Sequence, residues 1–142
     1  MKIRILAVST LVAATSIAAV TSAFAEKVAM KATLNGATEV PANSSAGKGT
    51  AAITFDTATK MLTWKVTYSG LSGPATAAHF HGPAEPGKNA GVVVPFKDPA
   101  SGAEGSATLT DAQAADLEAG KYYVNVHTAA NPGGEIRGQV TK

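Results

Sequence analysis

The sequence predicts an all-β protein, an antiparallel β-sandwich of seven or eight short strands with one short connecting helix. Three observations predict this fold class. Runs in which apolar and polar residues alternate recur along the chain. Turn-forming residues separate these runs about every 8 to 12 residues, a spacing typical of sandwiches and barrels. Helix signals occur in one segment only, which begins at Thr110.

The first half of the chain supplies three of the expected strands. Residues 28–34 alternate loosely between apolar and polar side chains, and residues 49–55 do so more regularly. Residues 61–69 give the clearest alternation, because every second side chain from Leu62 onward is apolar. This period-2 pattern is that of a strand with one buried and one solvated face. We expect Trp64, in the middle of the run, to anchor the core.

The second half supplies shorter strands. Residues 76–81 end at Gly82-Pro83, and residues 92–94 precede Pro95, which indicates a sheet edge or a strand end. Further strands are expected at 105–109, 122–127 and 135–140.

The single helix is expected to start after Thr110. Threonine is a favoured N-cap, and Gln113 stands at the capping-box position three residues later. Gly120 can end the helix in the left-handed conformation. Since only about two to three turns fit in between, this is a connecting helix.

The start of the chain is typical of a secretory leader. Lys2 and Arg4 give a positive beginning, a long apolar run follows, and Ala23-Phe24-Ala25 fits the small-x-small cleavage rule. We therefore expect a cleaved signal peptide at 1–25, a single domain at 26–142 and a periplasmic or secreted location.

Composition argues against several functions. The chain has no cysteine, so it can form no disulfide and offers no thiol nucleophile. Without Lys2 and Arg4, 10 basic residues balance 10 acidic ones, and no basic patch favours nucleic acid. There is no G-x-S-x-G motif and no evident carboxylate pair beside the histidines. We therefore expect a protein that is not an enzyme.

The three histidines form the candidate site. His79 and His81 are two residues apart in an expected strand, so both imidazoles lie on one face and Phe80 lies on the other. His127 ends the expected strand 122–127, on the same face as Asn125 and opposite the apolar valines. If the two strands are neighbours, three imidazoles converge on an outer face.

Three converging imidazoles predict a metal site. Imidazole is the commonest metal ligand in proteins, and three neutral imidazoles suit copper or zinc at ~2.0–2.1 Å. We expect His79, His81 and His127 to bind the ion, partly covered by the loop 82–91, and to leave one coordination position open.

Structural roles are the alternative for these residues. The histidines would then hold loops in place by hydrogen bonds to Asn89, to Asn131 or to the backbone. Glu135 and Arg137 share one strand face. They would make a surface ion pair with a cross-strand partner, worth about 1 kcal/mol at most, or Glu135 would orient a metal-bound histidine.

Four segments of the chain, taken together, resemble the CHRD domain, which is repeated in the developmental regulator chordin and occurs singly in bacterial exported proteins. The segments are residues 37–41, 78–83, 120–128 and 131–139. The resemblance covers about residues 28 to 140, and the chain is similar to the bacterial single-domain members of the family. It implies a β-sandwich and an extracytoplasmic location.

The H-x-H strand is also similar to that of copper/zinc superoxide dismutase, another β-sandwich. We therefore expect a sandwich of the immunoglobulin-like or superoxide-dismutase-like type. The further histidine and the aspartate that complete the two-metal site of that enzyme have no counterpart here, so dismutase-type redox chemistry is the least favoured function.

The sequence thus predicts an exported, non-enzymatic CHRD-domain protein that binds copper or zinc through the three histidines. Affinity should fall below about pH 6, because histidine ligands must be deprotonated. The alternative is an extracytoplasmic interaction or adhesion domain with an envelope or extracellular protein partner. Neither nucleic-acid binding nor membrane insertion after cleavage of the leader is expected.

Overall fold

The computed structural model describes residues 25–142. The predicted signal peptide therefore lies outside the described residues, except for Ala25. Among the described residues there is no helix with the length and apolar character needed to cross a membrane.

The described residues form eight strands, one α-helix and one short 3-10 helix, which confirms the all-β prediction. The strands are β1 (Lys27–Asn35), β2 (Lys48–Asp56), β3 (Met61–Ser69), β4 (Ala75–His81), β5 (Val92–Pro95), β6 (Glu104–Thr108), β7 (Tyr123–Thr128) and β8 (Ile136–Gln139); the helices are η1 (Gly36–Thr38) and α1 (Asp111–Glu118).

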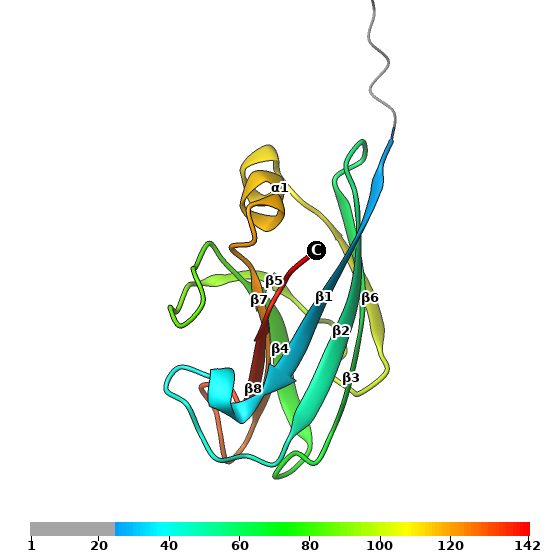
Figure 1. The fold of residues 1–142 in the computed structure, drawn as a ribbon. Helices are drawn as coiled ribbons and strands as arrows, with labels where there is room; N and C mark the ends of the chain where they lie inside the picture. The colour runs from blue at the N-terminus through cyan, green and yellow to red at the C-terminus, as the bar shows by residue number, and fades with distance from the viewer. Residues whose placement is uncertain (1–24) are drawn as a thin grey trace, which may run out of the picture.

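All eight strands belong to one antiparallel sheet, in the order β5-β4-β7-β8-β1-β2-β3-β6. The sheet curls until its two halves face each other, and the result is nearly a barrel (Figure 1). Its two edge strands, β5 and β6, line the same groove together with Trp64. The two layers of the predicted sandwich are therefore halves of one sheet, joined where β8 pairs with β1.

Trp64 anchors the core between the two halves, as its place in the alternation predicts. It is 6% exposed, meets the edge of Phe80 at 5.1 Å between ring centroids and stacks on Phe96 at 4.8 Å. Gly105 pairs with Trp64 across β6 and β3, and a Cβ there would clash with the indole. Burial of aromatic rings contributes roughly 25 cal/mol per Å² of apolar surface, so this cluster stabilises the facing of the two halves.

Helix α1 has the predicted termini. The Thr110 hydroxyl accepts a hydrogen bond from Gln113 N at 3.2 Å, and Gln113 Oε1 accepts one from Thr110 N at 2.9 Å. Gly120 has a φ of 75°, the left-handed conformation that glycine adopts without strain. Leu117 is buried and fastens the helix to the core.

Strands β7 and β8 are largely buried on both faces, as is the end of β4 at Phe80 and His81. Their inner face packs on the core through Phe80, Val124 and Ile136. Their outer face is polar, and loop segments cover it. The buried polar and charged side chains of the described residues are Glu39, His81, Asn125, Thr128, Glu135 and Arg137.

Arg137 joins the covering segments to the sheet. Its Nη1 donates to Asn89 Oδ1 at 2.8 Å, and its Nη2 donates to the Lys88 carbonyl. Asn89 Nδ2 in turn donates to the Val40 carbonyl at 3.2 Å. The loop 82–91 and the segment after η1 are thereby held together over the outer face of β8.

The predicted surface ion pair involving Glu135 and Arg137 is wrong. Both side chains are buried, and neither takes part in an ion pair of the described residues. The Glu135 carboxylate instead accepts hydrogen bonds from Ser45 Oγ, Ser72 Oγ and Thr128 Oγ1, each at 2.6 Å, and from Ser72 N at 2.8 Å. Sequence spacing gives the strand face of a side chain but does not reveal the loops that cover it.

Hydrogen bonding decides the ionisation of Glu135. Burial opposes the charged form, but the hydroxyls of Ser45, Ser72 and Thr128 and the Ser72 amide outweigh it and lower the pKa of Glu135 to about 2. A carboxyl group with a lowered folded-state pKa stabilises the fold above its ordinary pKa. That contribution is lost as the pH falls from about 4.5 towards 2.

We predict that Glu135→Gln lowers the free energy of unfolding at pH 7 by roughly 1–3 kcal/mol, because the carboxylate that accepts four bonds is lost. The variant should also lose the part of the acid destabilisation between about pH 4.5 and 2 that Glu135 supplies. Denaturant unfolding at several pH values measures both effects. Glu104→Gln, at an exposed carboxyl paired with Lys65, is the matched control and should stay within about 0.5 kcal/mol of wild type. Equal stability of the Glu135 variant at pH 7 would contradict the prediction.

Candidate metal centre

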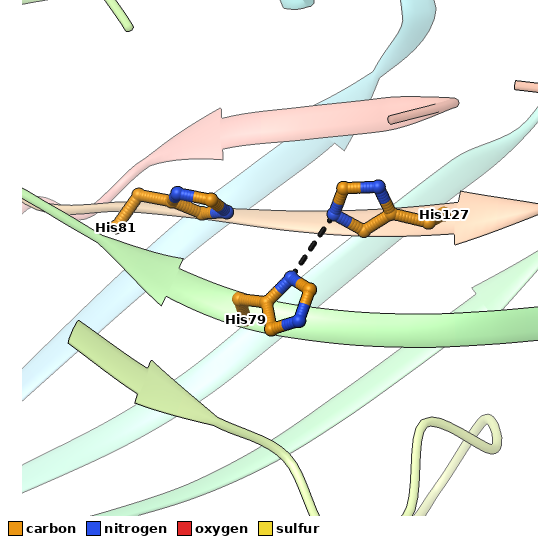
Figure 2. Close-up of side chains that lie close together, drawn as sticks. All are labelled: His79, His81 and His127. Carbon is orange, nitrogen blue, oxygen red and sulfur yellow. Dashed lines mark hydrogen bonds between the residues drawn. The ribbon is translucent and has the colours of Figure 1, made fainter. Parts of the chain in front are cut away.

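The pairing of β4 with β7 brings the three histidines together. The strands are antiparallel, with His79 opposite Asn125 and Ala77 opposite His127. Because side chains alternate between faces, His79, His81 and His127 all lie on the outer face and Phe80 lies on the inner one. The structure confirms the predicted neighbourhood of the two strands and the predicted face of all three imidazoles (Figure 2).

The three imidazoles form one cluster. His79 Nδ1 and His127 Nε2 are 3.0 Å apart, the contact that Figure 2 marks with a dashed line. One nitrogen from each ring can be chosen so that all three lie within 4.8 Å of one another. His81 is 8% exposed, and the other two rings are half-buried. The predicted convergence is confirmed as a geometry; metal binding by these residues stays a prediction.

Backbone carbonyls orient two of the rings. His81 Nδ1 lies 3.0 Å from the Ala90 carbonyl oxygen, and His127 Nδ1 lies 2.8 Å from that of Pro132. A carbonyl oxygen only accepts hydrogen bonds, so both Nδ1 atoms carry the hydrogen. In each neutral ring the lone pair is then on Nε2, which points into the cluster. Such an outer hydrogen bond is the usual support of a metal-binding histidine.

The same two hydrogen bonds serve the structural alternative. They tie the loop 82–91 and the turn before β8 to the sheet, as the second interpretation of the histidines expects. The partners are backbone carbonyls and not the side chains of Asn89 or Asn131. The two roles differ in what they predict for added metal.

Burial favours the neutral form of two histidines. Desolvation lowers the pKa of His79, and the nearby His127 and His81 lower it further. Desolvation also lowers the pKa of His81; bonds to the Ala90 carbonyl and to Asn125 oppose that effect in part, and His127 and Arg137 add to it. Neutral imidazole is the form that binds metal.

Asn125 is the site residue that sequence reasoning did not assign. Its Oδ1 lies 3.0 Å from His81 Nε2 and 2.9 Å from His127 Nε2. The amide oxygen therefore stands between two ring nitrogens, and Asn125 is 3% exposed. The signal was its position two residues before His127, on the same strand face.

A family profile described as the CHRD domain matches residues 30–140. The chain belongs to the CHRD-domain family. It matches no curated protein and no solved structure.

The four segments that resemble the CHRD domain meet at the histidine cluster. Residues 78–83 supply His79 and His81, and residues 120–128 supply Asn125 and His127. The other two segments supply the buried Glu39 and Arg137. In this CHRD domain the recognisable segments thus build one polar layer on the outer face of the sheet.

Aromatic and cationic groups support the His81 ring. Tyr123 stacks on it at 4.8 Å between centroids and 3° between planes. The Arg137 guanidinium lies 3.4 Å from the centroid of the Tyr123 ring. The resulting stack fixes the plane of His81, so its Nε2 has one direction.

Glu39 completes the layer behind Asn125. Burial raises the pKa of Glu39, while the Val40 amide, Arg137 and Asn125 act to lower it. Its Oε1 is buried without a well-formed hydrogen bond, and Oε2 accepts one from Val40 N at 3.2 Å. A Cβ at Gly134 would clash with Glu39 Oε1 and crowd Asn125 Nδ2, so the carboxylate and the amide NH2 border the same small space.

We predict that His79 and His81 of the metal-free protein titrate below pH 6.5, because their folded-state pKa values are lowered. Protonation then favours the unfolded chain, so metal-free stability should decline as the pH falls below about 6.5. NMR titration of the imidazole ring protons measures each pKa. A His79 or His81 that titrates above 6.5 would show that desolvation does not control the site.

Proposed function

We propose that this CHRD-domain protein is an exported, non-enzymatic module that binds copper or zinc through His79, His81 and His127. One observation carries the proposal: hydrogen bonds from Nδ1 to backbone carbonyls leave the Nε2 lone pairs of His81 and His127 directed into the cluster. The His79 ring adds a third nitrogen 3.0 Å from His127 Nε2.

The chemistry of the donors supports a borderline transition metal. Imidazole nitrogens suit Cu(II) and Zn(II), whereas Ca2+ and Mg2+ prefer oxygen ligands. The rings are held by loops and by the Tyr123 stack, so little ordering is needed when an ion binds. Partial burial also lowers the local dielectric constant, which strengthens the bond between an ion and its ligands.

Export is part of the proposal and rests on the leader-like residues 1–25. A periplasmic or secreted protein meets metal ions outside the buffering of the cytoplasm. The absence of a recognisable nucleophile or general-base pair in the sequence supports binding rather than catalysis.

A second candidate function is an extracytoplasmic interaction domain in which the histidines are structural. The observation that favours it is the tie of His81 and His127 to the carbonyls of two covering loops. If this alternative is right, added metal changes neither the melting temperature nor the conformation of the loops. The ligand is then a specific envelope or extracellular protein.

Metal titration separates the two functions. We predict that the protein binds one Cu(II) or Zn(II) and that His79→Ala, His81→Ala and His127→Ala each weaken binding at least tenfold. Because the ligands must be neutral, affinity should fall below about pH 6. Isothermal titration calorimetry of the purified protein measures both.

Thermal unfolding provides the independent readout. An ion that binds only the folded state stabilises it by about 2.7 kcal/mol at 100 times its Kd. Thr63→Ala, on the exposed face of β3 in the other half of the sheet, is the matched control and should bind like wild type. If added metal does not change the Tm, or if His81→Ala binds metal as tightly as wild type, the result contradicts the proposed metal site and favours the interaction domain.

A further inference from the structure

Hydrogen-bond accounting around Asn125 leaves too few hydrogens. His81 Nδ1 and His127 Nδ1 use theirs on the carbonyls of Ala90 and Pro132. When both rings are neutral, their Nε2 atoms therefore present lone pairs, and both face Asn125 Oδ1, at 3.0 Å and 2.9 Å. An amide oxygen is also an acceptor only. A hydrogen on His79 Nδ1 can be donated to His127 Nε2. It does not supply a donor for the two contacts of Asn125 Oδ1 with ring nitrogens.

The amide orientation of Asn125 follows from its other side. Its Nδ2 borders the Glu39 carboxylate above Gly134, and their interaction acts to lower the pKa of Glu39. A flipped amide would bring Oδ1 against that buried carboxylate and leave two acceptors facing each other. Glu39 therefore turns the oxygen of Asn125 towards the histidines.

We propose that Asn125 Oδ1 is the fourth ligand of the ion, and that Glu39 is a positioning residue that holds the Asn125 amide in the ligating orientation. This inference rests on the proposed function and deepens it. A cation among two lone-pair nitrogens and an amide oxygen resolves the excess of acceptors, which a three-histidine site with an open position does not. Three nitrogens and one oxygen then fill a four-coordinate set from the protein alone.

The separations of the donors favour Cu(II) within this site. Ligands ~2.0–2.1 Å from one ion lie about 2.9 Å apart at a right angle and about 3.3 Å apart at a tetrahedral angle. His127 Nε2 lies 3.0 Å from His79 Nδ1 and 2.9 Å from Asn125 Oδ1. Asn125 Oδ1 lies 3.0 Å from His81 Nε2. Opposite corners of a square are about 4.1 Å apart, and nitrogens from the three histidines lie within 4.8 Å of one another. Tetragonal sites with nitrogen and oxygen ligands are typical of Cu(II).

Azide is the probe that distinguishes a filled fourth position from an open one. Azide bound to Cu(II) gives a charge-transfer absorption band that can be titrated. With Asn125 as a ligand, azide must displace it, so wild type loaded with Cu(II) should bind azide at least tenfold more weakly than Asn125→Ala. The same substitution should lower Cu(II) affinity about 10–100-fold.

A charge-conserving exchange keeps the test independent of folding defects. The double variant Glu39→Gln with Asn125→Asp retains one buried carboxylate and one amide but exchanges their places. It should bind Cu(II) at least as tightly as wild type and resist azide, because a carboxylate oxygen replaces the amide oxygen. Glu39→Gln alone should weaken Cu(II) binding and admit azide, because a glutamine amide can present either its oxygen or its NH2 to Asn125 and no longer selects one orientation of that amide. Asn89→Ala is the control, because it removes the hydrogen bonds of Asn89 to Val40 and Arg137, and neither of these bonds involves the histidines or Asn125. It should match wild type in its azide affinity.

The outcomes separate the two proposals. Wild type that binds no Cu(II) ends the metal-binding function itself. Wild type that binds Cu(II) but takes azide as readily as Asn125→Ala refutes the fourth ligand while the three-histidine site stands. A double variant that loses Cu(II) binding while it keeps its circular dichroism spectrum also overturns the inference.

Discussion

The pairing register between β4 and β7 is the constraint on which the whole site depends. With His79 opposite Asn125, alternation sends both to the outer face and sends Phe80 and Val124, another opposed pair, to the inner one. A slip of one residue would exchange the two sets. The hydrophobic core therefore fixes the cluster: the contact of Phe80 with Trp64 holds the register that makes the imidazoles converge.

Burial of the outer face gives the cluster its chemical character. On an ordinary solvated face the three imidazoles would be mobile, and desolvation would not lower the pKa values of His79 and His81. Here covering loops supply carbonyl acceptors to His81 and His127 and exclude water from His81. At the other end of the layer, Glu135 binds hydroxyls from two further loops, those of Ser45 and Ser72, and from β7. The loops packed on the outer face of the sheet thus both orient the imidazole rings and desolvate them.

Most of the strands could be predicted from the sequence because period-2 alternation is local. The strand 61–69 and the helix cap at Thr110 coincide with their predictions, since neighbouring residues decide both. The same reasoning did not predict the burial of Glu135 and Arg137. Their spacing gave a common face correctly, but a strand pattern does not tell whether a loop 90 residues away in the chain, such as that of Ser45, covers that face.

The all-β class, the family resemblance and the face on which each histidine lies could be inferred from the order of the amino acids alone. Each of these follows from residue types at fixed spacing. The tertiary structure decided the rest: which strands are neighbours, how the sheet curls into one nearly closed layer, and the meeting of Asn125 and Glu39 with the histidines. The physical reason is that β-pairing and loop packing join residues distant in the chain, and no local pattern records such contacts.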